Sequence, residues 1–340
     1  MGLGARGLGL GSEIGSREMI RIIEEAALRA VITPQVAVDA MREAFRADGE
    51  GRAHVPGVIN LDVPARRGEF HVKTALIDGV PHVAVKIASG FFDNPALGLP
   101  SGSGLMAVFD AATGMPVAIL LDNGFLTDIR TGAAGAIAAE VLAPRTFATV
   151  GVIGSGLQAR YQVRCLRSVR TFSRIVAWSR DRAGLDAYVR DMRAEGHDAT
   201  AVATPEAVCR TADVIVTATP AREPLVRAEW LRPGHHVTAL GSDSPGKQEL
   251  DAACLARADL LVVDRLTQCA AFGELRHALD SGLVQPGGVH AELGEIVAGL
   301  KKGRTSPEQI TIADLTGVGF QDTAIASAYL EISKFGNLEI

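Results

Sequence analysis

Cysteine is scarce in this sequence. The four cysteines lie far apart, form no CxxC pair and do not stand at metal-ligand spacing from a histidine. The eight histidines form neither an HxxxH nor an HExxH pattern. We therefore expect structural thiols in a reducing cytoplasm, and no metal at the functional site.

Long apolar runs and basic blocks are absent too. No apolar run reaches the roughly 18–20 residues of a membrane-spanning helix, and the N-terminus lacks the charged-then-apolar order of a signal peptide. The 34 Lys and Arg residues against 39 Asp and Glu leave a net charge of −5, which argues against nucleic acid or an anionic membrane as a partner. A GxSxG motif is also missing, which disfavours a serine hydrolase. These absences leave a small molecule as the expected ligand.

What the sequence does contain is a glycine motif between regular elements. A β-branched run, 148–153, leads into GSGLQA at 154–159. An amphipathic segment suited to a helix follows, and then a second strand-like run, 174–178. Strand, GxGxxA, helix and strand in this order form the context that a dinucleotide-binding motif requires.

The individual residues of this motif suit a nucleotide. Gly154 permits the tight turn, and Gly156 lets the backbone approach a pyrophosphate. Leu157 and Gln158 open the helix, whose N-terminus offers unpaired N–H groups to phosphates. The alternative is a glycine-rich turn that binds nothing. The glycines of segment 4–11 have no strand before them, so we interpret that segment as a flexible extension.

The remaining pattern divides the chain into two parts. Residues 18–47 contain two helical patterns, and alternating apolar runs from residue 56 to 127 predict a largely antiparallel sheet with a hairpin turn at 112–114. A helix rich in small residues is expected at 128–142, and Pro144 marks a boundary. Strand-like runs then alternate with helical ones: 149–153, 175–178, 213–217, 236–240, 260–263 and 309–314. That alternation predicts a doubly wound parallel sheet.

A last helix, 322–334, is expected to cross back to the first part. We therefore predict an α/β protein in which the parallel-sheet domain, residues 144–320, is inserted into a mainly antiparallel α+β domain formed by residues 1–143 plus 321–340.

Three basic residues of the first domain are candidates for chemistry. Lys73 and Lys86 lie on alternating strands, and Arg130 opens the helix of small residues. A lysine that faces inward from a sheet is costly unless it is paired or functional; the alternative for each lysine is a solvated face. A long loop rich in Gly, Pro and Asn is expected after Lys86 and suits a site.

In the second domain, candidate residues follow the strands, because ligands of doubly wound sheets sit beyond the carboxyl ends of strands. Asp243 follows the run 236–240 and is placed to face the reactive end of a cofactor, although it is equally suited to an Asx turn before Pro245. Thr217 and Thr219 end another strand and could line the same crevice. Val318, in the TGVG segment after the last strand, could close over it.

Several of these blocks together resemble the ornithine cyclodeaminase/μ-crystallin family. They are VAVKIASGFFDNPALGLPSGSG, LLDNGFLTDIRTGAAGAIAAEVLAPR, VGVIGSGLQAR and GSDSPGKQELD, in this order. The C-terminal blocks look most like the branch named ectoine utilisation protein C, whose relatives include imine reductases that make aspartate from iminosuccinate. The resemblance spans roughly residues 30–335 and implies a homodimer, with an inserted Rossmann domain that holds NAD or NADP.

The resemblance also implies residue roles. Lys86 matches the family lysine near the reacting carbon. Arg130, next to Thr131 beside the cofactor, matches the arginine that binds the substrate carboxylate. Asp243 matches the acid that handles the amine or water in the cyclodeaminase, and Lys73 matches a frequently basic position.

One family feature is missing. Members often carry an arginine shortly after a proline of the first sheet, but Val58 and its neighbours provide none. Arg52 or Arg66 could substitute from nearby. The departure weakens any transfer of ornithine as the substrate.

The choice of cofactor depends on the end of the second strand of the nucleotide unit. Ser179 and Arg180 resemble the Asn-Arg of μ-crystallin and favour a 2′-phosphate, whereas Asp181 stands one or two residues late to hold a 2′-hydroxyl. The residues favour NADP and leave NAD open.

Three functions compete. The leading one is an NAD(P)-dependent imine reductase or amino acid dehydrogenase of a small carboxylated substrate, of the iminosuccinate-to-aspartate type. The second is an ornithine cyclodeaminase that recycles NAD internally. The third is a non-catalytic NADP or small-ligand binder like μ-crystallin, against which the combination of Lys86, Arg130 and Asp243 argues.

Overall fold

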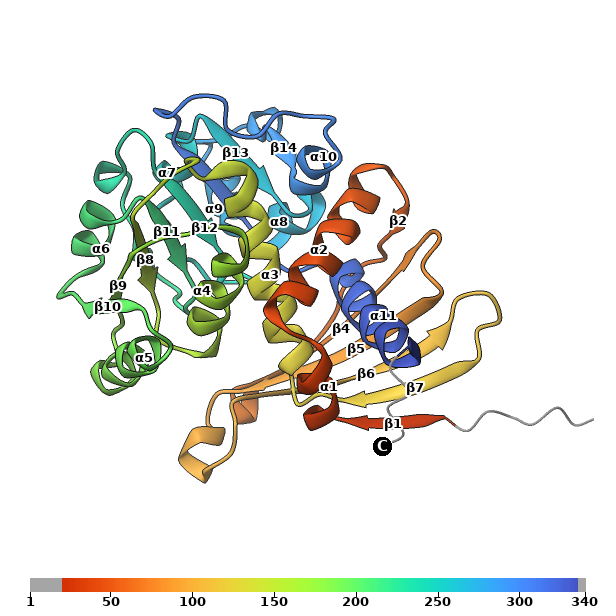
Figure 1. Cartoon of the computed structure of the whole chain (residues 1–340). Helices are drawn as coiled ribbons and strands as arrows, with labels where there is room; N and C mark the ends of the chain where they lie inside the picture. The colour runs from red at the N-terminus through yellow and green to blue at the C-terminus, as the bar shows by residue number, and fades with distance from the viewer. Residues whose placement is uncertain (1–19, 336–340) are drawn as a thin grey trace, which may run out of the picture.

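The structure, a computed structural model, describes residues 20–335. Two sheets form its framework, one in each lobe of Figure 1. The glycine-rich segment 4–11 lies outside the described residues. No helix within residues 20–335 is long and apolar enough to cross a membrane. The same range holds no group of three or more His, Cys, Asp and Glu residues suited to a metal ion.

The first sheet is largely antiparallel, as expected. Its strands follow the order β1-β7-β6-β5-β4-β2, with β3 also paired to β4. Their bounds are β1 Arg21–Glu24, β2 Ala53–His54, β3 Ile59–Val63, β4 Gly68–Ile77, β5 His82–Phe91, β6 Gly102–Asp110 and β7 Pro116–Leu121. Helices α11 (Gly319–Phe335) and α2 (Pro34–Gly49) pack side by side, and α11 lies against β4 and β5 (Figure 1). One face of the sheet is therefore covered.

Two local expectations in this lobe are wrong. The first helical pattern of residues 18–47 begins as a strand, β1, which pairs in parallel with β7 before α1 (Glu25–Val31) starts. Pairing at an open sheet edge prevails there over local helix propensity. The loop after Lys86 is also shorter than expected, because β5 and β6 stay paired as far as Gly90 and Gly102.

The second sheet is parallel throughout. Its order is β10-β9-β8-β11-β12-β15-β13-β14. The strands are β8 Thr149–Ile153, β9 Arg174–Trp178, β10 Asp198–Ala201, β11 Val214–Thr217, β12 His236–Ala239, β13 Leu260–Val263, β14 Ala291–Glu292 and β15 Thr311–Asp314. The predicted doubly wound sheet is confirmed. Strand order reverses direction between β8 and β11, which is where such sheets bind ligands.

Short helices connect these strands. They are α4 Leu157–Val169, α5 Arg182–Ala194, α6 Pro205–Thr211, α7 Ala252–Ala256, α8 Leu266–Phe272, α9 Glu274–Asp280 and α10 Leu293–Val297. The edge strands β10 and β14 escaped the sequence analysis. The sequence of β10, DATA, has no β-branched apolar run, and β14 is only two residues long.

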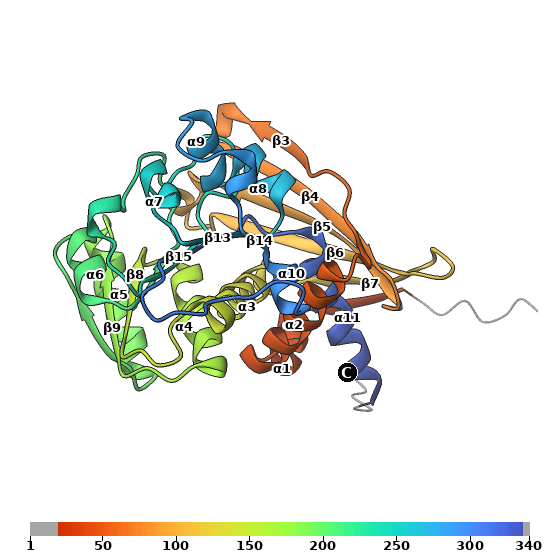
Figure 2. The same cartoon turned by 90° about the horizontal axis from the view of Figure 1, so that it is seen from above.

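Helix α3 (Phe125–Leu142) joins the two lobes and packs against both α2 and α4 (Figures 1 and 2). Its small residues have a direct purpose, since a Cβ on Gly132 would lie 2.7 Å from the Tyr161 carbonyl oxygen and one on Gly135 would lie 2.0 Å from Gln162 Oε1. The parallel sheet lies wholly between α3 and α11 in sequence, and α11 returns to the first sheet. Because α3 packs on both lobes, the exact division at residues 144 and 320 stays a prediction.

Candidate active site

A cavity of about 210 Å³ lies where the carboxyl ends of β12 and β15 meet β4, β5 and α3. Its size suits a small acid rather than a drug-sized ligand. The residues that line it are His71, Lys73, Lys86, Ala88, Thr127, Asp128, Arg130, Thr131, Ala134, Gln158, Leu240, Asp243, Leu315, Thr316, Gly317 and Gln321. Both candidate lysines, the candidate arginine and the candidate aspartate therefore share one cavity.

Lys73 and Lys86 are directly opposite each other on β4 and β5, on the face that α11 covers. Their exposed fractions are 7% and 2%, so the alternative of a solvated face is wrong for both. Lys73 Nζ donates to the carbonyl oxygens of Thr316 at 3.2 Å and Gly317 at 2.7 Å. Lys86 Nζ instead reaches the carboxylate of Asp322, 3.1 Å from Oδ1 and 3.0 Å from Oδ2.

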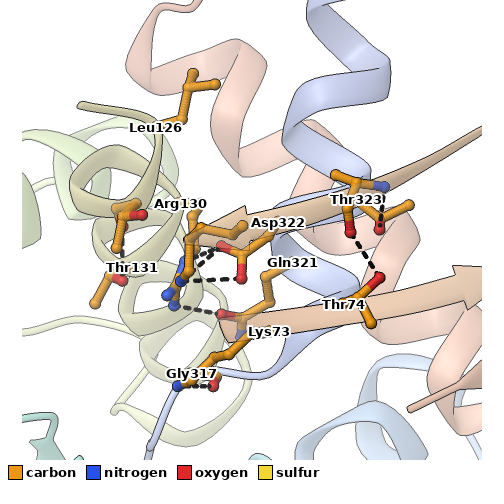
Figure 3. A network of polar contacts seen from close by, with 12 residues as sticks. Lys73, Thr74, Leu126, Arg130, Thr131, Gly317, Gln321, Asp322 and Thr323 are labelled. Carbon is orange, nitrogen blue, oxygen red and sulfur yellow. Dashed lines mark hydrogen bonds and ion pairs between the residues drawn. The ribbon is translucent and has the colours of Figure 1, made fainter. Parts of the chain in front are cut away.

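Asp322 also binds Arg130. Arg130 Nε donates to Asp322 Oδ1 at 3.0 Å, and Arg130 Nη1 donates to Gln321 Oε1 at 2.7 Å (Figure 3). Gly317 lies so close to this guanidinium that a Cβ would be 2.7 Å from Nη1. One carboxylate on α11 therefore orients two cations that come from β5 and α3.

The electrostatics of the network follow from its burial. Burial, with repulsion from Arg130 and Lys73, lowers the pKa of Lys86 to about 7 against the attraction of Asp322. Burial and the charge of Arg130 likewise lower the pKa of Lys73. Burial alone would raise the pKa of Asp322, but Lys86 and Arg130 hold it below its ordinary value. Lys86 is thus placed to gain or lose a proton near neutral pH.

Asp243 approaches the same cavity from the nucleotide domain. Its side chain is 49% exposed and accepts a hydrogen bond from Lys247 Nζ at 2.7 Å. Lys247 also lies 3.8 Å from Glu69 Oε1 of β4, so the pair connects the two lobes. Although desolvation acts in the opposite direction, Lys247 lowers the pKa of Asp243 below its ordinary value. No hydrogen bond from a backbone N–H to Asp243 accompanies this ion pair among the described contacts, which disfavours the Asx turn.

The glycine motif borders a second cavity, of about 300 Å³. It is lined by Gly154, Ser155, Gly156, Trp178, Ser179, Arg180, Asp181, Ala218, Thr219, Pro220, Ala221 and Leu225. Gly154 has a φ of +123°, and a Cβ there would lie 2.5 Å from the Ala218 carbonyl oxygen. A Cβ on Gly156 would meet nothing within 4 Å. The N-terminus of α4 thus faces open space, which fits a pyrophosphate.

A sequence model described as the ornithine cyclodeaminase/mu-crystallin family matches residues 17–334. The chain belongs to this family. It is 46% identical over 311 residues to an uncharacterized cyclodeaminase of Sinorhizobium fredii, with 91% of this chain and 94% of that protein aligned. The resemblance inferred from the sequence is confirmed for the family, and its ectoine branch stays a prediction.

Solved structures of the family superimpose closely on the chain. An archaeal alanine dehydrogenase dimer with bound NAD has a TM-score of 0.87 at 36% identity, over 94% of this chain and 97% of that one. Δ1-pyrroline-2-carboxylate reductase of Thermococcus litoralis, in complex with NADH and L-proline, has a TM-score of 0.89 at 28% identity, over 93% of this chain and 98% of that one. Iminosuccinate reductase of Paracoccus denitrificans, in complex with NAD⁺, has a TM-score of 0.85 at 31% identity, over 93% of this chain and 97% of that one.

Not every predicted cofactor residue of this family member reaches a cavity. Thr217 is fully buried and donates through Oγ1 to Glu249 Oε2 at 2.7 Å, so its hydroxyl is already occupied. Val318 is also fully buried, in the apolar core. Leu157 is 51% exposed but lines neither cavity. Thr219 does border the nucleotide cavity.

Thr131 and Gln158, predicted as cofactor residues, line the lysine cavity instead. Gln158 Nε2 donates to Asp128 Oδ1 at 2.8 Å. Burial raises the pKa of Asp128 to about 6 although Gln158 opposes the shift. Asp128 thus adds a half-buried carboxyl group to the cavity, which the sequence analysis missed.

Glu249 was missed as well. Besides Thr217 it accepts hydrogen bonds from the N–H and hydroxyl groups of Thr219 and from the N–H of Gly241. Burial raises its pKa. It fixes the two loops that follow β11 and β12, and nothing in the spacing of GKQELD indicated this role.

The two arginines considered as substitutes for the arginine expected near Val58 both lie outside the cavity. Arg52 is held by Glu50, with Nη2 2.6 Å from Oε2, and by the carbonyl oxygen of Asp78. Arg66 is exposed. Neither of them lines the cavity, so neither replaces the missing carboxylate ligand.

Proposed function

We propose that this protein is an NAD(P)-dependent oxidoreductase that interconverts imino and amino groups of small carboxylic acids. The single observation that carries the proposal is the buried Lys86–Asp322–Arg130 network in a small cavity next to the glycine motif. Reduction of the C=N bond of an imino acid requires that the substrate carboxylate be held in place and that a proton donor lie near the nitrogen. In this network Arg130 is suited to bind the carboxylate and Lys86 to donate the proton. The family structures named for such reactions support it.

The dinucleotide fits the second cavity. Gly156 leaves room for its pyrophosphate at the start of α4, while Ser179, Arg180 and Thr219 border the space beyond. When bound, NAD(P)H supplies a hydride to the imine carbon and is oxidised, while the C=N electron pair moves to the nitrogen, which takes up a proton.

The residues of the chain act on the substrate. Arg130, fixed through Nε and Nη1, turns its remaining guanidinium edge to a carboxylate and holds the reacting carbon in place. Lys86 donates the proton to the nitrogen during reduction and accepts it during oxidation, since its pKa of about 7 allows both. Asp243, kept ionised by Lys247, stabilises positive charge that develops at the nitrogen.

For the substrate itself we propose an imino acid of the iminosuccinate type, reduced to an amino acid such as aspartate. The support is the Paracoccus denitrificans structure and the two adjacent lysines of the cavity. We also retain the ectoine utilisation protein C branch as a proposal, since its motifs are those of the C-terminal half.

A second candidate is a cyclodeaminase with internally recycled NAD. The name of the Sinorhizobium fredii relative favours it, and Asp243 would then act on the amine or the attacking water. The missing arginine near Val58 speaks against ornithine in particular.

One assay separates these functions. Purified protein is mixed with NADH or NADPH, ammonia and a panel of 2-oxo acids, and separately with ornithine. Net cofactor oxidation that requires ammonia supports the reductase. Ammonia release from ornithine without net change of cofactor supports the cyclodeaminase, and dinucleotide binding with neither activity leaves a non-catalytic binder.

We further propose a homodimer formed through the uncovered face of the first sheet. Ile59, Val72, Ile87 and Leu105 stand opposite one another across β3, β4, β5 and β6 on the face away from Lys86. Ile59 is 65% exposed and Ile87 40%. An apolar row of this extent on a sheet is typical of an interface.

A further inference from the structure

The lysine cavity contains more buried positive than negative charge. Lys73, Lys86 and Arg130 are all buried, and within residues 20–335 Asp322 is the carboxylate that pairs with Lys86 and Arg130. Asp322 is shared by Lys86 and Arg130. Lys73 is hydrogen-bonded only to two neutral carbonyl groups in the described structure. A buried ammonium without a counter-ion is costly unless a ligand provides one.

The other titratable groups that line the cavity already have hydrogen-bond or ion-pair partners. Asp243 is 2.7 Å from Lys247, and Asp128 accepts a hydrogen bond from Gln158. His71 is hydrogen-bonded to Asn60 through Nδ1 at 2.6 Å, and its Nε2 lies 3.4 Å from Glu69. None of these side chains forms an ion pair with Lys73.

Gln321 provides a second, independent observation. Its Nε2 is buried and has no hydrogen-bond partner in the described structure, although the residue lines the cavity. The orientation of the amide is fixed, because Arg130 can only donate and therefore Oε1 must be the atom that accepts from Nη1. The NH₂ group is consequently the end left to meet a ligand, and a buried donor without an acceptor is destabilising.

We propose that Lys73 and the amide NH₂ of Gln321 form a subsite for a second carboxylate, so that the substrate is a dicarboxylic imino or amino acid. This inference rests on the proposed function and assigns residues to its substrate class. Arg130 holds the carboxylate next to the reacting carbon, and the subsite holds the distal one. Two carboxylates then balance the two positive charges that Asp322 leaves uncompensated.

The same subsite rejects other substrates. A monocarboxylic imine leaves both Lys73 and Gln321 without a partner, and loss of an expected hydrogen bond to a buried polar group is a strong basis of discrimination. A diamino acid such as ornithine brings a second ammonium toward Lys73 and is repelled. The subsite therefore also favours the reductase over the cyclodeaminase.

The experiment compares two imines formed in place from ammonia, one from oxaloacetate and one from pyruvate. Cofactor oxidation without ammonia is subtracted. We expect wild-type kcat/KM to be at least about 100-fold higher for the dicarboxylate.

Lys73→Met keeps the length of the side chain and removes its charge. It should lower kcat/KM for the oxaloacetate imine by about 10- to 100-fold, the range for a lost hydrogen bond to a charged group, and change the value for the pyruvate imine less than about 3-fold. The exposed Lys302→Met is the matched control and should change neither.

A binding measurement serves as a readout that does not depend on turnover. Succinate and propionate, which differ by one carboxylate, are titrated by calorimetry into the protein saturated with NAD⁺ or NADP⁺. Succinate should bind at least about 10-fold more tightly than propionate to the wild type, and Lys73→Met should abolish the difference. Gln321→Glu, which keeps the acceptor for Arg130 but places a negative charge in the subsite, should weaken succinate as well.

The outcomes distinguish the two proposals. If the wild type reduces no imine yet binds succinate in a Lys73-dependent way, the proposed reaction is wrong and the subsite stands. If the wild type reduces the pyruvate imine as efficiently as the other, or if Lys73→Met affects both imines and both acids equally, the subsite is wrong while the reductase stands.

Discussion

The ammonium of Lys86 lies 3.0 Å from Oδ2 of Asp322, although the two residues stand 236 positions apart and belong to β5 and α11. The side chain of Asp322 is 0% exposed and that of Lys86 is 3% exposed. The inserted parallel-sheet segment separates them in sequence, so this buried network exists only when the chain has returned to its first sheet.

The first prediction concerns the pH dependence that this pair confers. Burial lowers the pKa of Lys86 to about 7, so in the free enzyme its ammonium form is lost as the pH rises through that value. Reduction, which needs the ammonium as donor, should lose kcat/KM above about pH 7. Oxidation of the amino acid, which needs the free amine, should gain kcat/KM as the pH rises to about 7 and then level off.

The oxidative direction is the cleaner measurement, because imine formation itself depends on pH. Lys86→Met should lower the turnover rate in both directions by at least about 100-fold. It should leave dinucleotide affinity within about 2-fold of the wild type. Near-wild-type activity of this variant would remove Lys86 from the catalytic residues.

Asp322→Asn tests the stability of the same network. Removing one partner of a buried ion pair costs about 3–5 kcal/mol, because Lys86 and Arg130 stay buried without their carboxylate. The loss of stability should be larger at pH 6 than at pH 9. Wild-type Lys86 is protonated only at the lower pH, so only there does its attraction to Asp322 stabilise the folded state. Urea denaturation at both pH values measures it. Asp191→Asn, which breaks the surface pair with Arg160, is the control and should cost less than about 1 kcal/mol. Equal losses in the two variants would contradict the buried ion pair as a stabilising element.

Sequence reasoning succeeded where the signal is local. The strand, glycine motif and helix at residues 149–169 lie where they were expected. Lys73, Lys86, Arg130 and Asp243 were all found, partly from their strands and partly from family motifs, and the structure brings them into one cavity.

It failed where the cause is tertiary. Asp322 and Gln321 begin an ordinary helical pattern, and an acidic residue in such a pattern normally faces water. Only the position of α11 over β4 and β5 buries them against Lys86 and Arg130. Residues 21–24 likewise become a strand only because the edge of β7 is available.

Two glycines of the nucleotide motif should respond differently to substitution. Gly154→Ala places a Cβ 2.5 Å from the Ala218 carbonyl at a φ of +123°, so the fold should lose about 1–3 kcal/mol. The added Cβ of Gly156→Ala meets nothing within 4 Å, so the free energy of unfolding should change by less than about 0.5 kcal/mol. Dinucleotide affinity should nevertheless fall, because the methyl group occupies the approach of the pyrophosphate. Thermal denaturation and titration of NAD(P)H fluorescence measure the two effects. Unchanged affinity in Gly156→Ala would show that the phosphates bind elsewhere.

The proposed dimer predicts an effect of one apolar residue on mass. Sedimentation of the wild type should give twice the mass of the chain. Ile87→Lys places a charge in the middle of the row Ile59, Val72, Ile87 and Leu105 and should shift the equilibrium to the monomer. Leu300→Lys, at a position that is 66% exposed in the other lobe, should leave the dimer intact. A wild type that sediments as a monomer at micromolar concentration excludes this interface.

The last prediction concerns cofactor preference. Arg180 borders the nucleotide cavity beside Ser179, whose hydroxyl accepts a hydrogen bond from Ser155 Oγ at 3.0 Å. A guanidinium at this rim attracts a 2′-phosphate, whereas a carboxylate repels it and accepts a hydrogen bond from a 2′-hydroxyl. Arg180→Asp should therefore lower the ratio of kcat/KM for NADPH over NADH by about 10- to 100-fold, mainly through the KM for NADPH. Arg182→Asp removes an exposed arginine that lies outside the cavity and faces Asp186, so the ratio should change less than about 2-fold. If the two variants share the wild-type ratio, Arg180 does not contact the 2′ position, and Asp181, which borders the same cavity, becomes the residue to test for NAD.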